Sequence, residues 1–245
     1  MTDHVWYVAY GSNLSADRFA CYLQGGQPPG AAFTYPGARD QTPPRASKAV
    51  WLPGSVYFAT ESQVWGGGRA LYDPDIPGKA AARSYLITTQ QFSDVVAQEM
   101  YREPGADLDL TELAALGRIQ VGEGRYETLI HAGQDEQMPL VTFTAPWGIG
   151  DVPLLSPSDA YLRTLGQGLL ESHGWGAQRV GEYLACPGHS GPGRPGRSRI
   201  SSPSGRLNAA PGPPRMPGAG LAISRVGRAQ RPRRPASGNP DRGRR

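Results

Sequence analysis

The sequence predicts an α+β fold, a small mixed β-barrel or β-sheet with flanking helices, followed by a tail with no fold of its own. Segments of strand composition are short and numerous, helical segments are few, and strand and helix do not alternate regularly as in a doubly wound sheet. Apolar periodicity ends near residue 186. We therefore expect one domain over residues 1–186 and a disordered, basic Pro/Gly/Arg-rich tail over residues 187–245.

The charge of the chain divides at the same point. Residues 187–245 hold 13 of the 25 basic residues and one acidic residue (+12), which leaves 12 basic and 20 acidic residues (−8) before them. The tail has 11 Pro and 11 Gly among 59 residues and no aromatic residue, so it buries too little apolar surface to offset its ordering entropy. It is either an out-of-frame extension or a basic arm with weak, non-specific affinity for nucleic acid. The acidic domain argues against a specific nucleic-acid partner.

Targeting, membrane and metal-binding patterns are not evident. The N-terminus lacks the pattern of a signal peptide, and no apolar run is long enough for a membrane span. Cys21 and Cys186 form no disulfide framework, and the four histidines are scattered without ligand spacing. We expect a cytoplasmic protein with no membrane partner, no metal and no cofactor, and the oligomeric state is not indicated.

The most informative stretch is an N-terminal strand that ends abruptly at a glycine. Apolar residues 5–10 precede Gly11, then come Ser12 and Asn13, both strong helix N-caps, and helix formers over residues 14–23. Such a turn presents backbone N–H groups at the positive end of a helix dipole, which suits an anion or a carbonyl oxygen. The alternative is an ordinary strand–helix turn with good caps.

The remaining elements follow from composition and turn signals. We expect a β-hairpin of residues 49–52 and 56–59 around Pro53-Gly54, and strands at 31–35, 70–72, 82–88, 125–131 and 140–144. Helices are expected at 110–116, from Ser156-Pro157 to about Gly174, and at 176–185.

A carboxylate lies on the apolar face of the helix expected from Thr88 or Thr89 to about residue 101. Phe92, Val95, Val96 and Met100 stand at i, i+3, i+4 and i+8, and Glu99 takes position i+7. A charged residue there is seldom buried without a partner or a function. Glu99 is therefore either a general base or a structural carboxylate paired with an arginine such as Arg83 or Arg125.

The tetrad Tyr10, Gly11, Ser12 and Asn13 resembles the opening of the γ-glutamylcyclotransferase-like family. The resemblance extends over about residues 5–185 and is greatest to actinobacterial-type members. In that family the catalytic glutamate closes a helix after a strand, which is the position of Glu99. Further similar features are Trp65-Gly66-Gly67-Gly68, Gly124-Arg125-Tyr126 and Pro157-Ser158-Asp159-Ala160-Tyr161.

The resemblance implies a metal-independent enzyme, a γ-glutamyl cyclotransferase or γ-glutamylamine lyase. A γ-glutamyl group of a small molecule would cyclise to 5-oxoproline and release its amine, with Glu99 as base and then acid. Tyr10, Gly11, Ser12 and Asn13 would bind the substrate, and Tyr126 and Tyr161 would be orienting hydroxyls. Members usually have Leu-Asp before this glutamate and Gly after it, whereas here Ala97-Gln98 and Met100 flank Glu99. That departure leaves open a non-catalytic small-molecule-binding module on the same fold.

Overall fold

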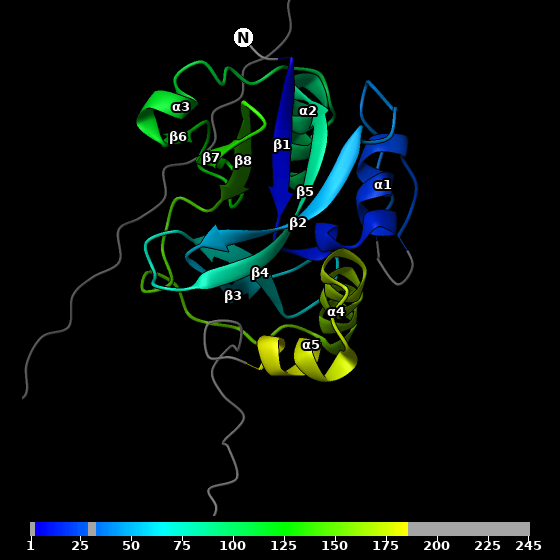
Figure 1. The fold of residues 1–245 in the computed structure, drawn as a ribbon, viewed down its shortest axis with the longest axis vertical. Helices are drawn as coiled ribbons and strands as arrows, with labels where there is room; N and C mark the ends of the chain where they lie inside the picture. The colour runs from blue at the N-terminus through cyan, green and yellow to red at the C-terminus, as the bar shows by residue number, and fades with distance from the viewer. Residues whose placement is uncertain (1–2, 29–32, 186–245) are drawn as a thin grey trace, which may run out of the picture. The chain divides into compact units, whose positions relative to one another are not determined.

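The computed structural model describes residues 3–28 and 33–185, which form two β-sheets with helices around them (Figure 1). The larger sheet has six strands in the order β2-β5-β1-β8-β7-β6, and the smaller pairs β3 with β4. Within the described residues β1 and β8 pair in parallel and the other neighbours are antiparallel, so the sheet is mixed and the predicted α+β class is confirmed. The strands are β1 (His4–Ala9), β2 (Ala46–Pro53), β3 (Ser55–Glu61), β4 (Gly68–Asp73), β5 (Lys79–Thr88), β6 (Arg118–Gln120), β7 (Thr128–Asp135) and β8 (Met138–Thr144).

The helices cover the sheets from two sides. They are the 3₁₀ helix η1 (Ser12–Leu14) and α1 (Ala16–Gln24), α2 (Thr89–Glu99), α3 (Leu113–Leu116), α4 (Asp159–His173) and α5 (Ala177–Leu184). Helix α2 packs on β1 and β5, and α4 packs on η1 (Figure 1). No helix among the described residues is long and apolar enough to cross a membrane. The predicted tail, residues 187–245, lies outside the described residues, as do residues 31 and 32 of the strand predicted at 31–35.

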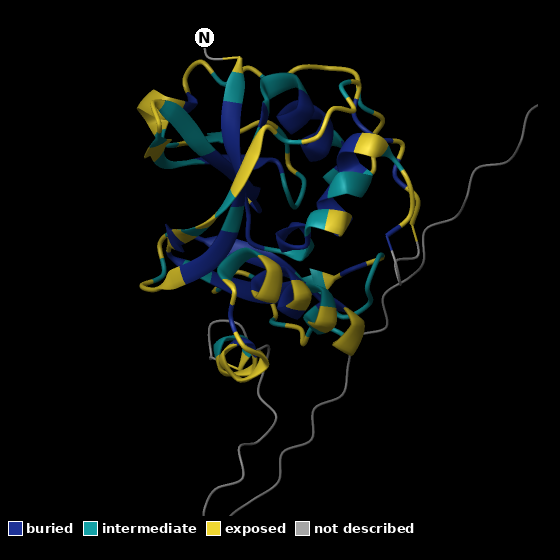
Figure 2. Ribbon diagram, turned by 45° about the vertical axis from the view of Figure 1, so that its right-hand side comes forward, coloured by how far each residue is buried: buried dark blue, intermediate teal, exposed yellow. Residues whose placement is uncertain are grey.

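The strand predicted at the N-terminus is the central one. β1 pairs with β5 from His4↔Thr88 to Ala9↔Arg83, and with β8 on its other edge. Because helices and the smaller sheet cover both of its faces, residues 5–10 are all buried (Figure 2). Tyr7 enters a hydrophobic cluster with Phe92 and Phe143, and Tyr10 enters a second cluster with Tyr161. The end of β1 is therefore held firmly where the glycine turn begins.

The capping role predicted for Ser12 and Asn13 is wrong. These residues form the single 3₁₀ turn η1, and α1 begins only at Ala16 with Ser15 in the N-cap position. Neither helix has a side-chain cap hydrogen bond. The extra turn separates the end of β1 from α1, and the side chain of Asn13 makes contacts across the fold instead.

Helix α2 begins as predicted, at a capping box in which Thr88 and Gln91 bond each other's backbone N–H. Phe92, Val95 and Val96 are buried as predicted, but buried polar residues also lie on the other faces. Glu99 is the last residue of the helix and is half-buried. The helix is thus enclosed on most sides, and its final turn carries the glutamate into the interior.

The hairpin predicted around Pro53-Gly54 is wrong. β2 pairs with β5 in the larger sheet, whereas β3 pairs with β4 in the smaller one. Gly54 has a φ of +104°, and its N–H donates to Gly78 O, so the chain turns from one sheet into the other. A local turn signal does not specify which strand becomes the partner.

We expect Gly54→Ala to destabilise the protein by about 1–3 kcal/mol, since an L side chain is strained at this φ. A Cβ there would lie 2.5 Å from Asp73 O, in the backbone of β4. Urea unfolding of the variant measures the loss. Gly105→Ala is the matched control, because nothing lies within 4 Å of a Cβ built at Gly105. Equal midpoints for the two variants would contradict this explanation of the sheet change.

Other boundaries differ from prediction by two or three residues. β7 begins at Thr128 rather than at Arg125, and its hairpin with β8 turns at Glu136 and Gln137, both with positive φ. Helix α4 begins two residues later than predicted, because Ser158 rather than Ser156 caps it by accepting from Tyr161 N. Gly174 ends α4 in the left-handed conformation, as its position predicts.

Candidate functional site

The structure brings all seven predicted site residues to one pocket, which we call the turn pocket. It is lined by the end of β1, η1, the last residue of α2, and side chains from β4, β8 and α4. The predicted residues among its lining are Tyr10, Gly11, Ser12, Asn13, Glu99, Tyr126 and Tyr161.

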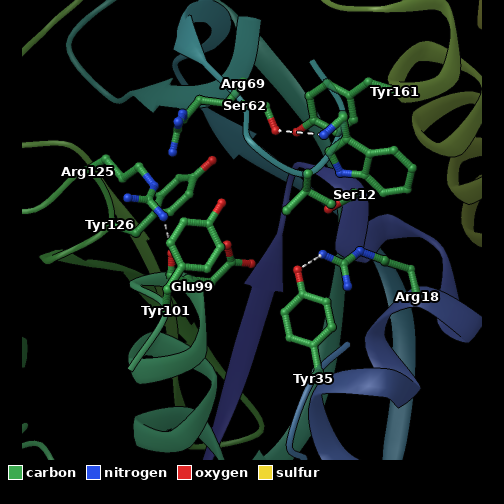
Figure 3. Close-up of a pocket in the computed structure, with 12 residues that line it drawn as sticks. Ser12, Arg18, Tyr35, Ser62, Arg69, Glu99, Tyr101, Arg125, Tyr126 and Tyr161 are labelled. Carbon is green, nitrogen blue, oxygen red and sulfur yellow. Dashed lines mark hydrogen bonds between the residues drawn. The ribbon is translucent and has the colours of Figure 1, made fainter. Parts of the chain in front are cut away.

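A second pocket adjoins the first and shares Ser12, Glu99, Tyr126 and Tyr161 with it (Figure 3). We call it the arginine pocket, because three arginines that the sequence analysis did not assign as ligand-binding residues line it: Arg18, Arg69 and Arg125. In Figure 3, Arg18 and Tyr35 lie on one side, opposite Glu99, Tyr101, Arg125 and Tyr126.

A hydrogen bond joins Asn13 of the turn η1 to Glu99 at the end of α2. Asn13 Nδ2 donates to Glu99 Oε1 at 3.2 Å and to the Tyr7 hydroxyl oxygen at 3.1 Å. Asn13 is 3% exposed, and its backbone oxygen accepts from the Tyr85 hydroxyl at 2.8 Å. The side-chain amide of Asn13 is thus fixed from the sheet side, and it orients the carboxylate of Glu99 in the pocket.

The predicted ion pair of Glu99 with Arg83 or Arg125 is not formed. Arg125 Nη2 donates to the backbone oxygen of Glu99 at 2.8 Å, and Arg83 pairs with Glu171. Within the described residues no salt bridge involves the carboxylate of Glu99. The carboxylate of Glu99 is therefore not neutralised by an arginine among the described residues. Arg125 holds the end of α2 through the backbone oxygen of Glu99 instead.

The tyrosines around Glu99 are neutral hydrogen-bonding groups. Burial raises the pKa of Tyr7 well above its usual value, and the charge of Glu99 raises it further. Burial likewise raises the pKa of Tyr10, Tyr126 and Tyr161. Because these hydroxyls keep their protons at physiological pH, each is able to donate one hydrogen bond.

The hydroxyls of Tyr10 and Tyr126 already have acceptors. Tyr10 donates to Phe143 O at 2.8 Å and Tyr126 donates to Ala70 O at 2.9 Å. Tyr161 instead accepts from Ala70 N at 3.3 Å, and among the described residues no acceptor is seen for its proton. A Cβ at Gly11 would lie 3.2 Å from the Tyr161 hydroxyl, so a larger residue there would crowd it. Tyr161 is thus a lining tyrosine whose hydroxyl is able to donate to a ligand. Tyr7 is another, because its hydroxyl accepts from Asn13 Nδ2 and no acceptor for its proton is seen among the described residues.

Comparisons with known proteins give partial similarities. No family model matches the chain. A curated protein from Arabidopsis thaliana, "Histone deacetylase 5", is 31% identical over 199 residues, covering 74% of this chain and 30% of that protein. The chain thus spans about a third of that relative's length. Among the described residues no cluster of three or more His, Cys, Asp or Glu side chains is placed to hold a metal ion.

Two solved structures show weak similarity in backbone arrangement. A γ-glutamyl cyclotransferase has a TM-score of 0.44 and 16% identity, over 78% of this chain and 92% of that one. An uncharacterized human protein has the same TM-score and identity, over 75% of this chain and 88% of that one. At this level the likeness says nothing about the role of any side chain.

Proposed function

We propose that this protein cyclises the γ-glutamyl group of a small molecule to 5-oxoproline and releases the attached amine, with Glu99 as base and then acid. The observation that carries the proposal is the hydrogen bond from Asn13 to Glu99 in the turn pocket. A glutamate oriented beside a turn with free backbone donors is the arrangement that intramolecular aminolysis requires.

The reaction moves two protons from the α-nitrogen to the departing nitrogen, one after the other, and consumes no water. Glu99 accepts a proton from the α-ammonium of the γ-glutamyl group, and the amine nitrogen attacks the γ-carbonyl carbon. The new C–N bond closes a five-membered ring and leaves a tetrahedral oxyanion. The ring nitrogen still carries two protons at this stage. Glu99 returns the first proton to the departing nitrogen, whose C–N bond breaks as the carbonyl re-forms, and it then takes the second proton from the ring nitrogen and passes it to the released amine, which leaves as an ammonium. Nucleophile and electrophile belong to one molecule, so the pocket needs only to hold the folded conformer.

Donors for the oxyanion or for the substrate carboxylate line the turn pocket at η1 and at Tyr161. The first N–H groups of a helical turn have no intrahelical acceptor, which here applies to η1 at Ser12 and Asn13. We assign the hydroxyl of Tyr161 as a third donor. The hydroxyls of Tyr10 and Tyr126 already donate to Phe143 O and Ala70 O. We therefore assign these two tyrosines a role in positioning the substrate by packing against it.

The direct test is release of 5-oxoproline from a panel of γ-glutamyl compounds: amino acids, peptides, and neutral and cationic amines. Release from at least one compound supports the proposal. The same compounds are tested for an increase in the melting temperature of the protein. Stabilisation without product would favour the binding module instead, and neither effect with any compound would refute both.

We expect Tyr161→Phe to lower kcat about 10- to 100-fold with a smaller change in KM, because the lost donor acts mainly on the oxyanion. Initial rates of 5-oxoproline release give both constants. Tyr72→Phe is the control, since Tyr72 is a buried tyrosine of the same cluster that does not line either pocket. Equal kinetics for Tyr161→Phe and the unmodified protein would remove Tyr161 from the mechanism.

A further inference from the structure

Tyr7 is a buried tyrosine of β1 that lines the turn pocket together with Glu99. It is 3% exposed. The register of β1 with β5 sets Tyr7 directly opposite Tyr85, and the two rings stack with their centres 6.4 Å apart. Both hydroxyls bond Asn13, because that of Tyr85 donates to its backbone oxygen and that of Tyr7 accepts from its side-chain amide. The pairing of two central strands thus brings Tyr7 to the residue that orients Glu99.

The charge of Glu99 fixes the direction of the hydrogen bond between Asn13 and Tyr7. Asn13 Nδ2 lies 3.2 Å from Glu99 Oε1 and 3.1 Å from the Tyr7 hydroxyl oxygen, so one NH₂ group serves both acceptors. The reverse orientation of the amide would set Asn13 Oδ1 against a carboxylate, and the two oxygens would repel each other. The observed orientation leaves Asn13 Oδ1 buried without a partner. Tyr7 is therefore an acceptor toward Asn13.

The proton of the Tyr7 hydroxyl consequently needs an acceptor elsewhere. Burial raises the pKa of Tyr7 well above its usual value and the charge of Glu99 raises it further, so the hydroxyl keeps this proton. The rings of Phe19, Phe92 and Phe143 pack around that of Tyr7, with centres 5.4 Å, 5.9 Å and 5.4 Å away, and hold the phenol in place. Since no acceptor is seen among the described residues, the turn pocket is the space into which the proton is donated.

A hydroxyl donor at this point of the pocket suits an oxygen of a γ-glutamyl substrate and does not suit its α-ammonium, which itself has only protons to donate. The γ-carbonyl oxygen is bonded to the carbon that the amine attacks, so it lies near Glu99 when ring closure begins. This oxygen also gains negative charge during the reaction. A hydroxyl that accepts from Asn13 is polarised by that bond, and its own donation strengthens as the charge on its acceptor grows.

We infer that Tyr7 is a further catalytic residue, whose hydroxyl donates to the γ-carbonyl oxygen while it accepts from Asn13. The substrate oxygen, Tyr7, Asn13 and Glu99 then form one hydrogen-bonded chain, which joins the atom that gains negative charge to the group that takes the proton. This inference rests on the proposed function, and it goes beyond it in assigning a donor from β1 and in linking that donor to the base.

We expect Tyr7→Phe to lower kcat for 5-oxoproline release about 10- to 100-fold with a smaller change in KM. Tyr57→Phe is the matched control and should keep full kcat. Tyr57 is 1% exposed, donates to Trp147 O at 3.2 Å and lines neither pocket. An unchanged kcat in Tyr7→Phe would overturn the inference.

A double-mutant cycle tests the link between Tyr7 and Asn13. The loss in kcat of the protein with both Tyr7→Phe and Asn13→Ala should be smaller than the product of the two single losses, because the hydroxyl acts partly through Asn13. Losses that multiply would show two independent residues and would overturn the chain that joins Tyr7 to the base.

A comparison of two ligands decides the inference without turnover. The ring carbonyl oxygen of 5-oxoproline is the former γ-carbonyl oxygen, whereas cyclopentanecarboxylate has a five-membered ring and a carboxylate but no ring carbonyl. Tyr7→Phe should weaken binding of 5-oxoproline about 2- to 10-fold and leave that of cyclopentanecarboxylate unchanged. Equal losses for the two ligands, or no loss for either, would overturn the inference. The expected affinities without any turnover of γ-glutamyl compounds would count against the proposed function alone.

The unmodified protein gives a second readout, which holds even if Tyr7→Phe does not fold. The hydroxyl proton of Tyr7 should move downfield in the proton NMR spectrum when 5-oxoproline is added, because a new hydrogen bond to a carbonyl oxygen deshields it. A Tyr7 hydroxyl proton that does not shift at saturating 5-oxoproline, or that shifts equally with cyclopentanecarboxylate, would overturn the inference.

Discussion

Glu99→Gln should abolish release of 5-oxoproline, with a loss in kcat of about 10²- to 10⁴-fold, while thermal stability changes little. The amide cannot accept the ammonium proton or return it to the departing amine. The amide oxygen of the variant is still able to accept a hydrogen bond from Asn13 Nδ2. In the unmodified protein this donor lies 3.2 Å from Glu99 Oε1. Arg125 bonds only the backbone oxygen of Glu99, and no salt bridge to the Glu99 carboxylate is seen among the described residues, so no ion pair is lost. Single-turnover assays and melting curves measure the two effects.

The matched control for this variant is Glu103→Gln, which makes the same change at an exposed residue after the end of α2. It should keep full activity. A Glu99→Gln protein with undiminished activity, or one that unfolds at the assay temperature, would show that Glu99 is structural. Binding of γ-glutamyl compounds by Glu99→Gln at unchanged affinity would separate the lost proton transfer from lost binding.

The parts of the site that sequence reasoning found are those with a local signal. The glycine after an apolar strand predicts where β1 ends, and the i+7 spacing places Glu99 on the inner face of its helix. Their proximity follows from the pairing of β1 with β5, which leads directly into α2. A contact over 86 positions, between Asn13 and Glu99, has no local signal of its own.

The arginine pocket was missed although one of its residues carried a usable signal. Arg18 lies on the buried face of α1 with Phe19 and Tyr22, as Glu99 does on α2. An arginine on an apolar helix face, like a glutamate there, is seldom buried without a partner or a function. Arg69 had no such signal. It is a half-buried residue of β4, and its place at the pocket depends on the pairing of β3 with β4. The wrong hairpin had the same cause, since strand partners depend on the whole sheet.

The ion pair of Asp94 with Arg39 was also missed, and it should dominate the stability of the segment around it. Asp94 lies in α2 with its side chain fully buried, and it accepts from Arg39 N at 2.8 Å and from Arg39 Nε at 2.9 Å. Arg39 also pairs with Asp107 and keeps about a third of its side chain exposed. This arrangement fastens the connection between α1 and β2 onto the helix that ends at Glu99.

We expect Arg39→Ala to destabilise the protein by about 3–5 kcal/mol, because it leaves the buried carboxylate of Asp94 without its cation. Asp94→Asn should cost less, about 1–3 kcal/mol, since the partly exposed Arg39 regains water and keeps Asp107. Urea unfolding measures both. Arg118→Ala is the control, because the Arg118–Asp75 pair is exposed and 3.8 Å long and should contribute less than about 1 kcal/mol. If Arg39→Ala costs no more than Arg118→Ala, the buried pair does not hold this connection in place.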